Sequence, residues 1–197
     1  MAGRMRLLPV ARIVAYPLWF CVKRTGAAQD VAEDVDWWAQ CIDNSDIAAL
    51  DRYSRFAFFC GTMPEFRTLV HLRLRSAPLL LRVVLRAFYR RSETLLFEVD
   101  RVGPALFIQH GVGTLIGADS IGSHCWINQN VTVGSTAKGR PTVGDRVRIG
   151  VGAVVLGPIT IHDDATIGAN ATVMRDVGPG ETVVAPLAVP LKRRQPD

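Results

Sequence analysis

The feature that most constrains the fold is an aliphatic residue that returns every six positions through the second half of the chain. The spacing is six without exception from Ile121 to Val133 and again from Val143 to Val173. The residues concerned are Ile121, Ile127 and Val133, followed by Val143, Ile149, Val155, Ile161, Ile167 and Val173. A period of six matches neither the turn of an α-helix nor the alternation of a β-hairpin.

Three such units close one triangular turn of a parallel β-solenoid, in which each unit is a short strand followed by a tight corner. The aliphatic side chain then points into the prism and stacks on its counterpart one turn later, as Ile149 would on Ile167. Glycine directly follows several of these residues and supplies permissive backbone at the corners. The repeat therefore predicts a parallel β-helix.

Two interruptions of the repeat mark candidate functional positions. From Val133 to Val143 the step is ten, so four extra residues push out a loop over 135–141. Upstream, Leu96, Val102 and Ile108 keep the spacing of six, and a step of seven to Leu115 predicts one extra residue beside His110. Insertions in a solenoid are tolerated at its corners, where functional residues concentrate.

The first half of the chain has a helical pattern between residues 30 and 91. We expect a short amphipathic turn at 36–38, a helix from Ile47 to Phe59 capped near Asn44, and further helices that begin at Pro64 and Leu79. The predicted organisation is an α-helical N-terminal region at 1–94, a β-helix domain at 95–180 and a C-terminal tail at 181–197.

Charge is distributed unevenly along the 197 residues. The formal net charge is +5, and residues 1–94 hold 14 Lys and Arg against 9 Asp and Glu. The arginines of this half are spread through an apolar helical pattern without interleaved stacking aromatics. They predict a solvated helix face, with a docking surface as the alternative, and no nucleic-acid partner.

The stretch from Leu7 to Val22 raises the question of a membrane anchor. It contains Arg12, is shorter than a spanning helix of about 20 residues, and lacks a clear cleavage site. We expect a helix packed on the domain, with peripheral membrane contact as the alternative. The four cysteines show neither a CxxC pair nor zinc spacing, so we expect buried thiols, a cytoplasmic protein and no metal.

The repeat, the loop and the sequence around His110 together resemble the hexapeptide acyltransferases, and within them the serine acetyltransferase-like group. The matching segments are 108–116, 121–134, 149–157 and 167–173. The resemblance covers the second half of the chain closely, and the N-terminal half agrees only in being helical. It implies a left-handed β-helix, here of about four turns, in a homotrimer with acetyl-CoA bound between neighbouring prisms.

The resemblance also assigns His110 as the general base that deprotonates an acceptor hydroxyl. An alcohol does not attack a thioester unaided at neutral pH, and imidazole has a pKa suited to accept its proton. Glu98 is the candidate acid that orients the imidazole, with Asp100 as its rival. Free-serine enzymes place an acid directly before the base, whereas this chain has Gln109, so the acceptor is either serine-like or another alcohol such as a saccharide.

The remaining candidate residues concern the two substrates. Small residues on successive turns would leave peptide groups open to the pantetheine arm, and basic residues would hold the phosphates of acetyl-CoA. The candidates for the acyl donor are Gly134, Ser135, Lys138, Gly152, Ala153, Ala171 and Lys192. Besides Gln109, Gln129 and Arg140 are the candidates for the acceptor, and Gln129 alternatively belongs to a stacked amide ladder with Asn128.

The sequence predicts an acetyl-CoA-dependent O-acetyltransferase acting by direct transfer to a small hydroxyl acceptor. An N-acetyltransferase acting on an amino sugar keeps the same chemistry with an amine as acceptor. A noncatalytic solenoid that binds a partner through its basic helical half is the alternative from another class.

Overall fold

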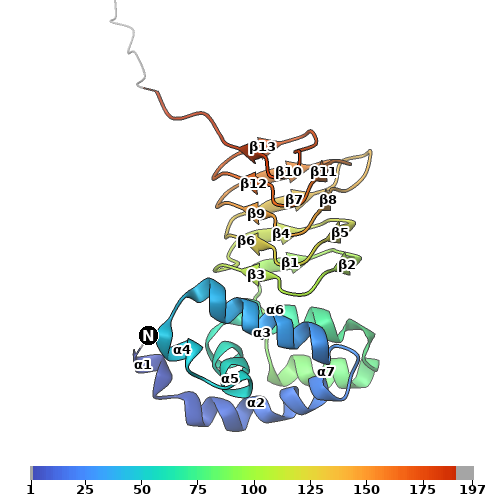
Figure 1. Cartoon of the computed structure of the whole chain (residues 1–197). Helices are drawn as coiled ribbons and strands as arrows, with labels where there is room; N and C mark the ends of the chain where they lie inside the picture. The colour runs from blue at the N-terminus through green and yellow to red at the C-terminus, as the bar shows by residue number, and fades with distance from the viewer. Residues whose placement is uncertain (1, 190–197) are drawn as a thin grey trace, which may run out of the picture.

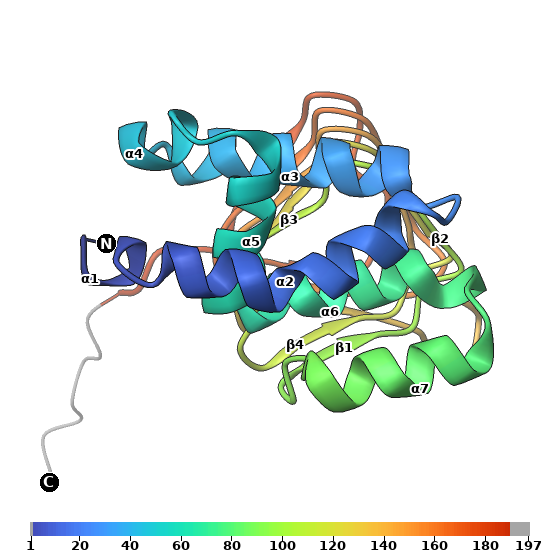
Figure 2. The same ribbon diagram turned by 90° about the horizontal axis from the view of Figure 1, so that it is seen from below.

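The computed structural model describes residues 2–189, which form a layer of helices at one end of a β-solenoid (Figure 1). The helices are α1 (Ala2–Met5), α2 (Leu8–Lys23), α3 (Ala28–Ile42), α4 (Ser45–Ala48), α5 (Arg52–Thr62), α6 (Pro64–Arg73), the 3-10 helix η1 (Leu74–Ser76) and α7 (Leu79–Phe88). Viewed from below the helical layer, α2 and α7 lie nearest the viewer and the solenoid lies behind them (Figure 2).

Parallel strands build the three faces of the solenoid. The first face has the order β1-β4-β7-β10-β13, the second β11-β8-β5-β2 and the third β14-β12-β9-β6-β3. The bounds are β1 (Leu95–Phe97), β2 (Arg101–Val102), β3 (Phe107–Ile108), β4 (Thr114–Ile116), β5 (Ser120–Ile121), β6 (Trp126–Ile127), β7 (Thr132–Gly134), β8 (Thr142–Val143), β9 (Arg148–Ile149), β10 (Val154–Leu156), β11 (Thr160–Ile161), β12 (Thr166–Ile167), β13 (Thr172–Val173) and β14 (Thr182–Val183).

The predicted inward residues form the core of the prism. All nine aliphatic residues of the two uninterrupted runs are buried. Ile149 pairs with Ile167 one turn later. Val133 pairs with Val155, so the loop at 135–141 does not disturb the stack of inward residues. The strands make about five turns rather than the four expected, because pairing begins at β1 and extends to β14, beyond residue 180.

The predicted register is wrong in the first turns. Leu96 is 56% exposed, and its partner Leu115 points outward as well, whereas Ile116 is fully buried. The step from Ile108 to the next inward residue is therefore eight, with two extra residues at the His110 turn, and the following step to Ile121 is five. Two adjacent aliphatic residues made both registers compatible with the sequence.

The helical region also differs from the prediction in two places. The turn expected at 36–38 lies inside the continuous helix α3. The single helix expected from Ile47 to Phe59 is divided, because Asp51 adopts an extended backbone and accepts a hydrogen bond from the backbone N–H of Ser54, which caps α5. Proline lies in the first turn of α6, and α7 begins directly after Pro78, as expected.

Helix α3 attaches the helical layer to the solenoid through two tryptophans. The indole N–H of Trp38 donates to the carbonyl of Leu106 at 2.7 Å, and its ring packs edge-on against Phe107. Trp37 donates to the carbonyl of Cys125 at 3.3 Å. A buried Trp whose N–H donates a hydrogen bond contributes buried apolar area and a directional contact. Helix α3 therefore fixes the orientation of the helical layer on the first turns of the solenoid.

Candidate active site

Two edges of the prism border the face formed by β1, β4, β7, β10 and β13. The histidine edge comprises the turns that precede these strands, at 109–113, 128–131, 150–153 and 168–171. The loop edge comprises the turns that follow them, at 98–100, 117–119, 135–141 and 157–159. The residues predicted from sequence fall on both edges.

His110 lies on the surface of the histidine edge, directly after β3. Its side chain is exposed and its backbone is left-handed, with φ at 66°. Gly111 follows with φ at 55° and fits tightly, because a β-carbon there would lie 3.2 Å from Cβ of Glu65. Two consecutive left-handed residues turn the chain sharply and hold the imidazole outside the prism, where a substrate can reach it.

Gln109 is buttressed from the neighbouring turn. Its side-chain Oε1 accepts a hydrogen bond from Nε1 of Trp126 at 3.2 Å. Trp126 in turn packs edge-on against Phe107 on the outer side of the third face. The amide next to His110 is thus fixed in place and neutral.

The small residues expected to leave an open backbone track are part of the core. Ala153 and Ala171 are buried, and their carbonyls accept from Thr132 and Val154 of the adjacent turns at 2.9 and 2.8 Å. Their N–H groups are also bonded within the prism. Neither residue therefore offers a peptide group without an internal hydrogen bond, and contact of the acyl donor with them stays a prediction.

Gly152 and Gln129 lie on the histidine edge, one turn apart. The N–H of Gly152 donates to the carbonyl of Gln129 at 3.2 Å. Asn128 donates its side-chain amide to the backbone carbonyl of Ile149. The Gln129 side chain is half-buried beside it.

The loop edge carries the predicted loop and its basic residues. Gly134 ends β7, and Ser135 and Lys138 are exposed. Arg140, the predicted contact for the acceptor, is engaged within the chain. Its guanidinium bonds Asp100 at 2.6 Å, Asp119 at 3.0 Å and the carbonyl of Glu98 at 2.9 Å, which clamps the loop to the prism.

Glu98 lies on the loop edge, and His110 lies on the histidine edge. Because β1 and β4 are parallel, the two residues are at opposite ends of the same face. A direct contact between them inside one chain does not fit this arrangement, and Asp100 is bound to Arg140. Lys192 lies outside the described residues, so the structure does not place it.

The close approach of α6 to the His110 turn was not foreseen. Glu65, in the first turn of α6, packs against Gly111 and so brings a carboxyl-bearing side chain next to the candidate base. The two segments are more than 40 residues apart in sequence, and no local pattern reports the contact. In the sequence, the glycine that directly follows His110 is the one hint of a close neighbour.

Two of the other histidines, His71 and His124, make structural contacts. His71 is buried, with Nε2 2.6 Å from the carbonyl of Tyr89, and burial lowers its pKa. His124 stacks edge-on against Trp37 at a corner between the second and third faces. Across residues 2–189, no group of three or more His, Cys, Asp or Glu side chains could hold a metal ion.

The four cysteines are free thiols. Cys60 and Cys125 are buried as expected, whereas Cys21 and Cys41 are only half-buried. Burial raises the pKa of the Cys41 and Cys125 thiols to about 12, so neither is a thiolate near neutral pH. They are unsuited to act as nucleophiles.

Comparison with known proteins agrees with the hexapeptide repeat seen in the solenoid. Residues 140–175 match the bacterial transferase hexapeptide (six repeats) family model. Serine acetyltransferase from Helicobacter pylori is 45% identical over 89 residues, which cover 43% of this chain and 52% of that protein. Serine acetyltransferase from Mycobacterium tuberculosis is 43% identical over 88 residues, covering 42% and 38%. In its solenoid half, the chain is similar to serine acetyltransferases of the hexapeptide-repeat class.

Solved structures extend this likeness to the helical layer. The soybean serine acetyltransferase apoenzyme matches with a TM-score of 0.59 and 26% identity over 81% of this chain and 66% of that one. Serine acetyltransferase from Neisseria gonorrhoeae matches with a TM-score of 0.60 and 27% identity, covering 87% and 68%. The serine acetyltransferase-like solenoid is therefore a left-handed β-helix behind an α-helical region. The chain spans about half the length of the Helicobacter relative.

Proposed function

We propose that this protein is an acetyl-CoA-dependent O-acetyltransferase that acts on the hydroxyl of a small acceptor. The observation that carries the proposal is an exposed imidazole, His110, held on an edge of a serine acetyltransferase-like β-helix. A soybean serine acetyltransferase was solved in complex with serine. Its 27% identity to this chain makes serine the first acceptor to test.

In this reaction His110 takes the proton of the acceptor hydroxyl as its oxygen attacks the thioester carbonyl. The C–O bond forms, a backbone N–H stabilises the oxyanion, and the C–S bond then breaks. The imidazolium returns the proton to the departing thiolate of CoA. No covalent acyl-enzyme is needed, which agrees with the buried, protonated state of Cys125.

We further propose that the working site forms between copies in a homotrimer. The base is on one edge of the prism, and the exposed Ser135 and Lys138 are on the other. If neighbouring prisms pack side by side, the histidine edge of one copy meets the loop edge of the next. That packing would bring Lys138 to the phosphates of acetyl-CoA and Glu98 toward the partner's His110. Because acetyl-CoA is an intracellular metabolite and the thiols are free, we place the reaction in the cytoplasm.

The acceptor is tested by release of free CoA thiol from acetyl-CoA in the presence of serine, homoserine and a panel of sugars. We expect turnover with at least one hydroxyl compound and a product that mild alkali cleaves. A product that survives alkali and hydroxylamine would be an amide, and would replace the O-acetyltransferase by the N-acetyltransferase. Absence of any heat on titration with millimolar acetyl-CoA would support a noncatalytic scaffold.

The shared site predicts complementation between two inactive variants. His110→Asn removes the base, and Glu98→Gln removes the proposed acid of the neighbouring copy. We expect each variant alone to lose activity. In randomly mixed trimers about a quarter of the interfaces combine an intact histidine edge with an intact loop edge, so about a quarter of wild-type turnover should return.

The measurement is turnover of the co-refolded mixture against each variant refolded alone. A mixture no more active than the sum of its parts would place Glu98 outside the partner's site. Full activity of Glu98→Gln alone would remove this acid from the mechanism and leave Glu65, which packs beside Gly111, as the carboxylate to test.

A further inference from the structure

Helices α2 and α7 leave a broad apolar surface exposed at the end of the molecule away from the solenoid. On α7 the side chains of Leu80 and Phe88 are 77% and 79% exposed, and on α2 that of Ile13 is 77% exposed. The complete set is Leu7, Val10, Ile13, Val14, Tyr16 and Phe20 with Leu79, Leu80, Val83, Val84 and Phe88, which we call the α2–α7 face. Soluble monomers rarely expose a contiguous apolar patch of this kind without a partner.

A hydrogen bond links the segment after α7 to α2 on this side of the molecule. The hydroxyl of Tyr89, directly after α7, donates to the carbonyl of Val14 in the middle of α2 at 2.7 Å. Seen from below, both helices lie on the same side of the molecule (Figure 2). The exposed residues of α2 recur at Val10, Ile13, Val14 and Phe20, which is the stripe of an amphipathic helix.

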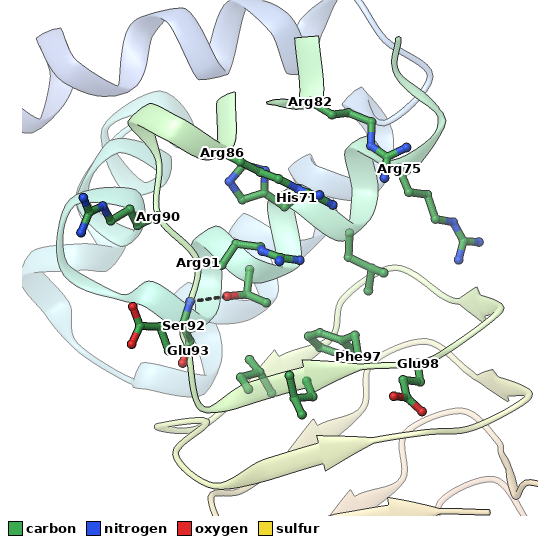
Figure 3. Close-up of a pocket in the computed structure, with 14 residues that line it drawn as sticks. His71, Arg75, Arg82, Arg86, Arg90, Arg91, Ser92, Glu93, Phe97 and Glu98 are labelled. Atoms are coloured by element: carbon green, nitrogen blue, oxygen red, sulfur yellow. Dashed lines mark hydrogen bonds between the residues drawn. The ribbon is translucent and has the colours of Figure 1, made fainter. Parts of the chain in front are cut away.

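A pocket rich in arginine adjoins this face between α6, α7 and β1 (Figure 3). It has a volume of about 580 Å³, and its lining includes Arg75, Arg82, Arg86, Arg90 and Arg91 against only two acids, Glu93 and Glu98. Arg86 and Arg91 extend into the same space, whereas Arg90 points the other way (Figure 3). Arg82 and Arg86 each follow an exposed apolar residue of α7 by three positions and so line one flank of the stripe.

This positive charge is not neutralised within the described part of the chain. None of the five pocket arginines forms an ion pair with a carboxylate among residues 2–189. Partial burial and the neighbouring Arg91 and Arg82 lower the pKa of Arg86, which reports mutual repulsion. The sequence has no Asp or Glu at 1–29 or at 66–92, the segments that carry α2 and α7.

We propose that the α2–α7 face docks on the surface of an anionic lipid membrane, with a lipid phosphate held in the arginine pocket. An apolar stripe flanked by arginines is the arrangement with which an amphipathic helix lies in a membrane interface. No helix within residues 2–189 has both the length and the hydropathy to cross a bilayer, so the attachment is peripheral. The solenoid then projects away from the lipid (Figure 1).

The charge of the α2–α7 face favours an anionic membrane over a second copy of the chain as its partner. A two-fold interface would place the α2–α7 face against itself. Each copy would bring a cluster of unpaired arginines to the interface and no Asp or Glu from 1–29 or 66–92 to pair with the other cluster, and unpaired charge at an interface is unfavourable. An anionic surface instead offers the complementary charge, and its acyl chains cover the exposed leucines, valines and phenylalanine.

The test is co-sedimentation of the full chain with vesicles of phosphatidylglycerol and phosphatidylcholine, compared with vesicles of phosphatidylcholine alone. We expect binding to the anionic vesicles that weakens as salt is raised. Arg82→Gln combined with Arg86→Gln should lower the partition coefficient about 20-fold or more. Leu80→Asp should lower it similarly, while Met174→Asp should leave it unchanged, because Met174 is an apolar residue of the solenoid that is 65% exposed, against 77% for Leu80.

Three outcomes would overturn the proposal. Absence of binding to anionic vesicles at low salt removes the membrane as partner. Saturable binding of inorganic pyrophosphate, with vesicle binding insensitive to Leu80→Asp, assigns the pocket to a soluble phosphate ligand. Self-association of the free protein that Leu80→Asp abolishes, without vesicle binding, assigns the face to a second copy. Each readout is independent of acetyl transfer, so failure of the proposed reaction leaves this test intact.

Discussion

Replacing His110 by Asn should lower the rate of acetyl transfer by about 100-fold or more, because the acceptor hydroxyl would lose its general base. Asparagine is the appropriate substitution here. It tolerates the left-handed backbone that His110 adopts at a φ of 66°, whereas most other residues would add strain to the loss of the imidazole. The measurement is CoA thiol release at saturating acetyl-CoA, with thermal unfolding as a check on the fold.

His124→Asn is the matched control. His124 is also an exposed corner histidine with a left-handed backbone, at a φ of 56°, but it lies between the second and third faces. We expect its turnover to stay within a few-fold of wild type. If His110→Asn retained activity within three-fold of wild type, or if both variants lost it equally, His110 would have no special role as base.

The core of the solenoid could be predicted from the sequence because burial repeats with the geometry of the prism. Each inward residue from Ile121 to Val173 faces the same environment, so selection of aliphatic side chains at one period is a physical necessity. The same reasoning failed near Leu115, where the adjacent Ile116 is the inward residue. Periodicity cannot decide between two neighbouring aliphatic residues at a turn that carries extra residues.

The candidate site was predictable only in part, for a different reason. The exposure of His110 followed from the irregular step in the repeat. Whether a small residue such as Ala153 fills the core or opens the backbone depends on where its peptide groups find hydrogen-bond partners, and the residue type is the same in both cases. Contacts such as Glu65 with Gly111 join segments distant in sequence and appear only once the helices are docked.

That docking depends on a buried ion pair between α3 and α6. Arg73 contacts both carboxylate oxygens of Asp34, at 2.8 and 2.9 Å, and donates to the carbonyls of Val102 and Gly103 at 2.7 Å. Asp34 also accepts from the backbone N–H of Leu106 at 3.1 Å. The side chains of Arg73 and Asp34 are only 4% and 1% exposed, so the pair joins both helices to the first turns without solvent.

Asp34→Ala should therefore destabilise the protein by about 3–5 kcal/mol, because it leaves the buried guanidinium of Arg73 with Asp30, 3.8 Å away and 44% exposed, as its remaining carboxylate. The free energy of unfolding is measured from urea denaturation monitored by tryptophan fluorescence. Arg52→Ala is the matched control, since it breaks an exposed ion pair with Asp36 and should cost less than about 1 kcal/mol.

A combined Asp34→Leu and Arg73→Met variant distinguishes charge burial from packing. Replacing both partners by apolar side chains removes the uncompensated charge, and buried ion pairs replaced in this way often lose little stability. We expect the double variant to recover much of the stability that Asp34→Ala loses. Equal destabilisation of the two would mean that the hydrogen bonds to Val102, Gly103 and Leu106, rather than the charge balance, hold α3 and α6 on the solenoid.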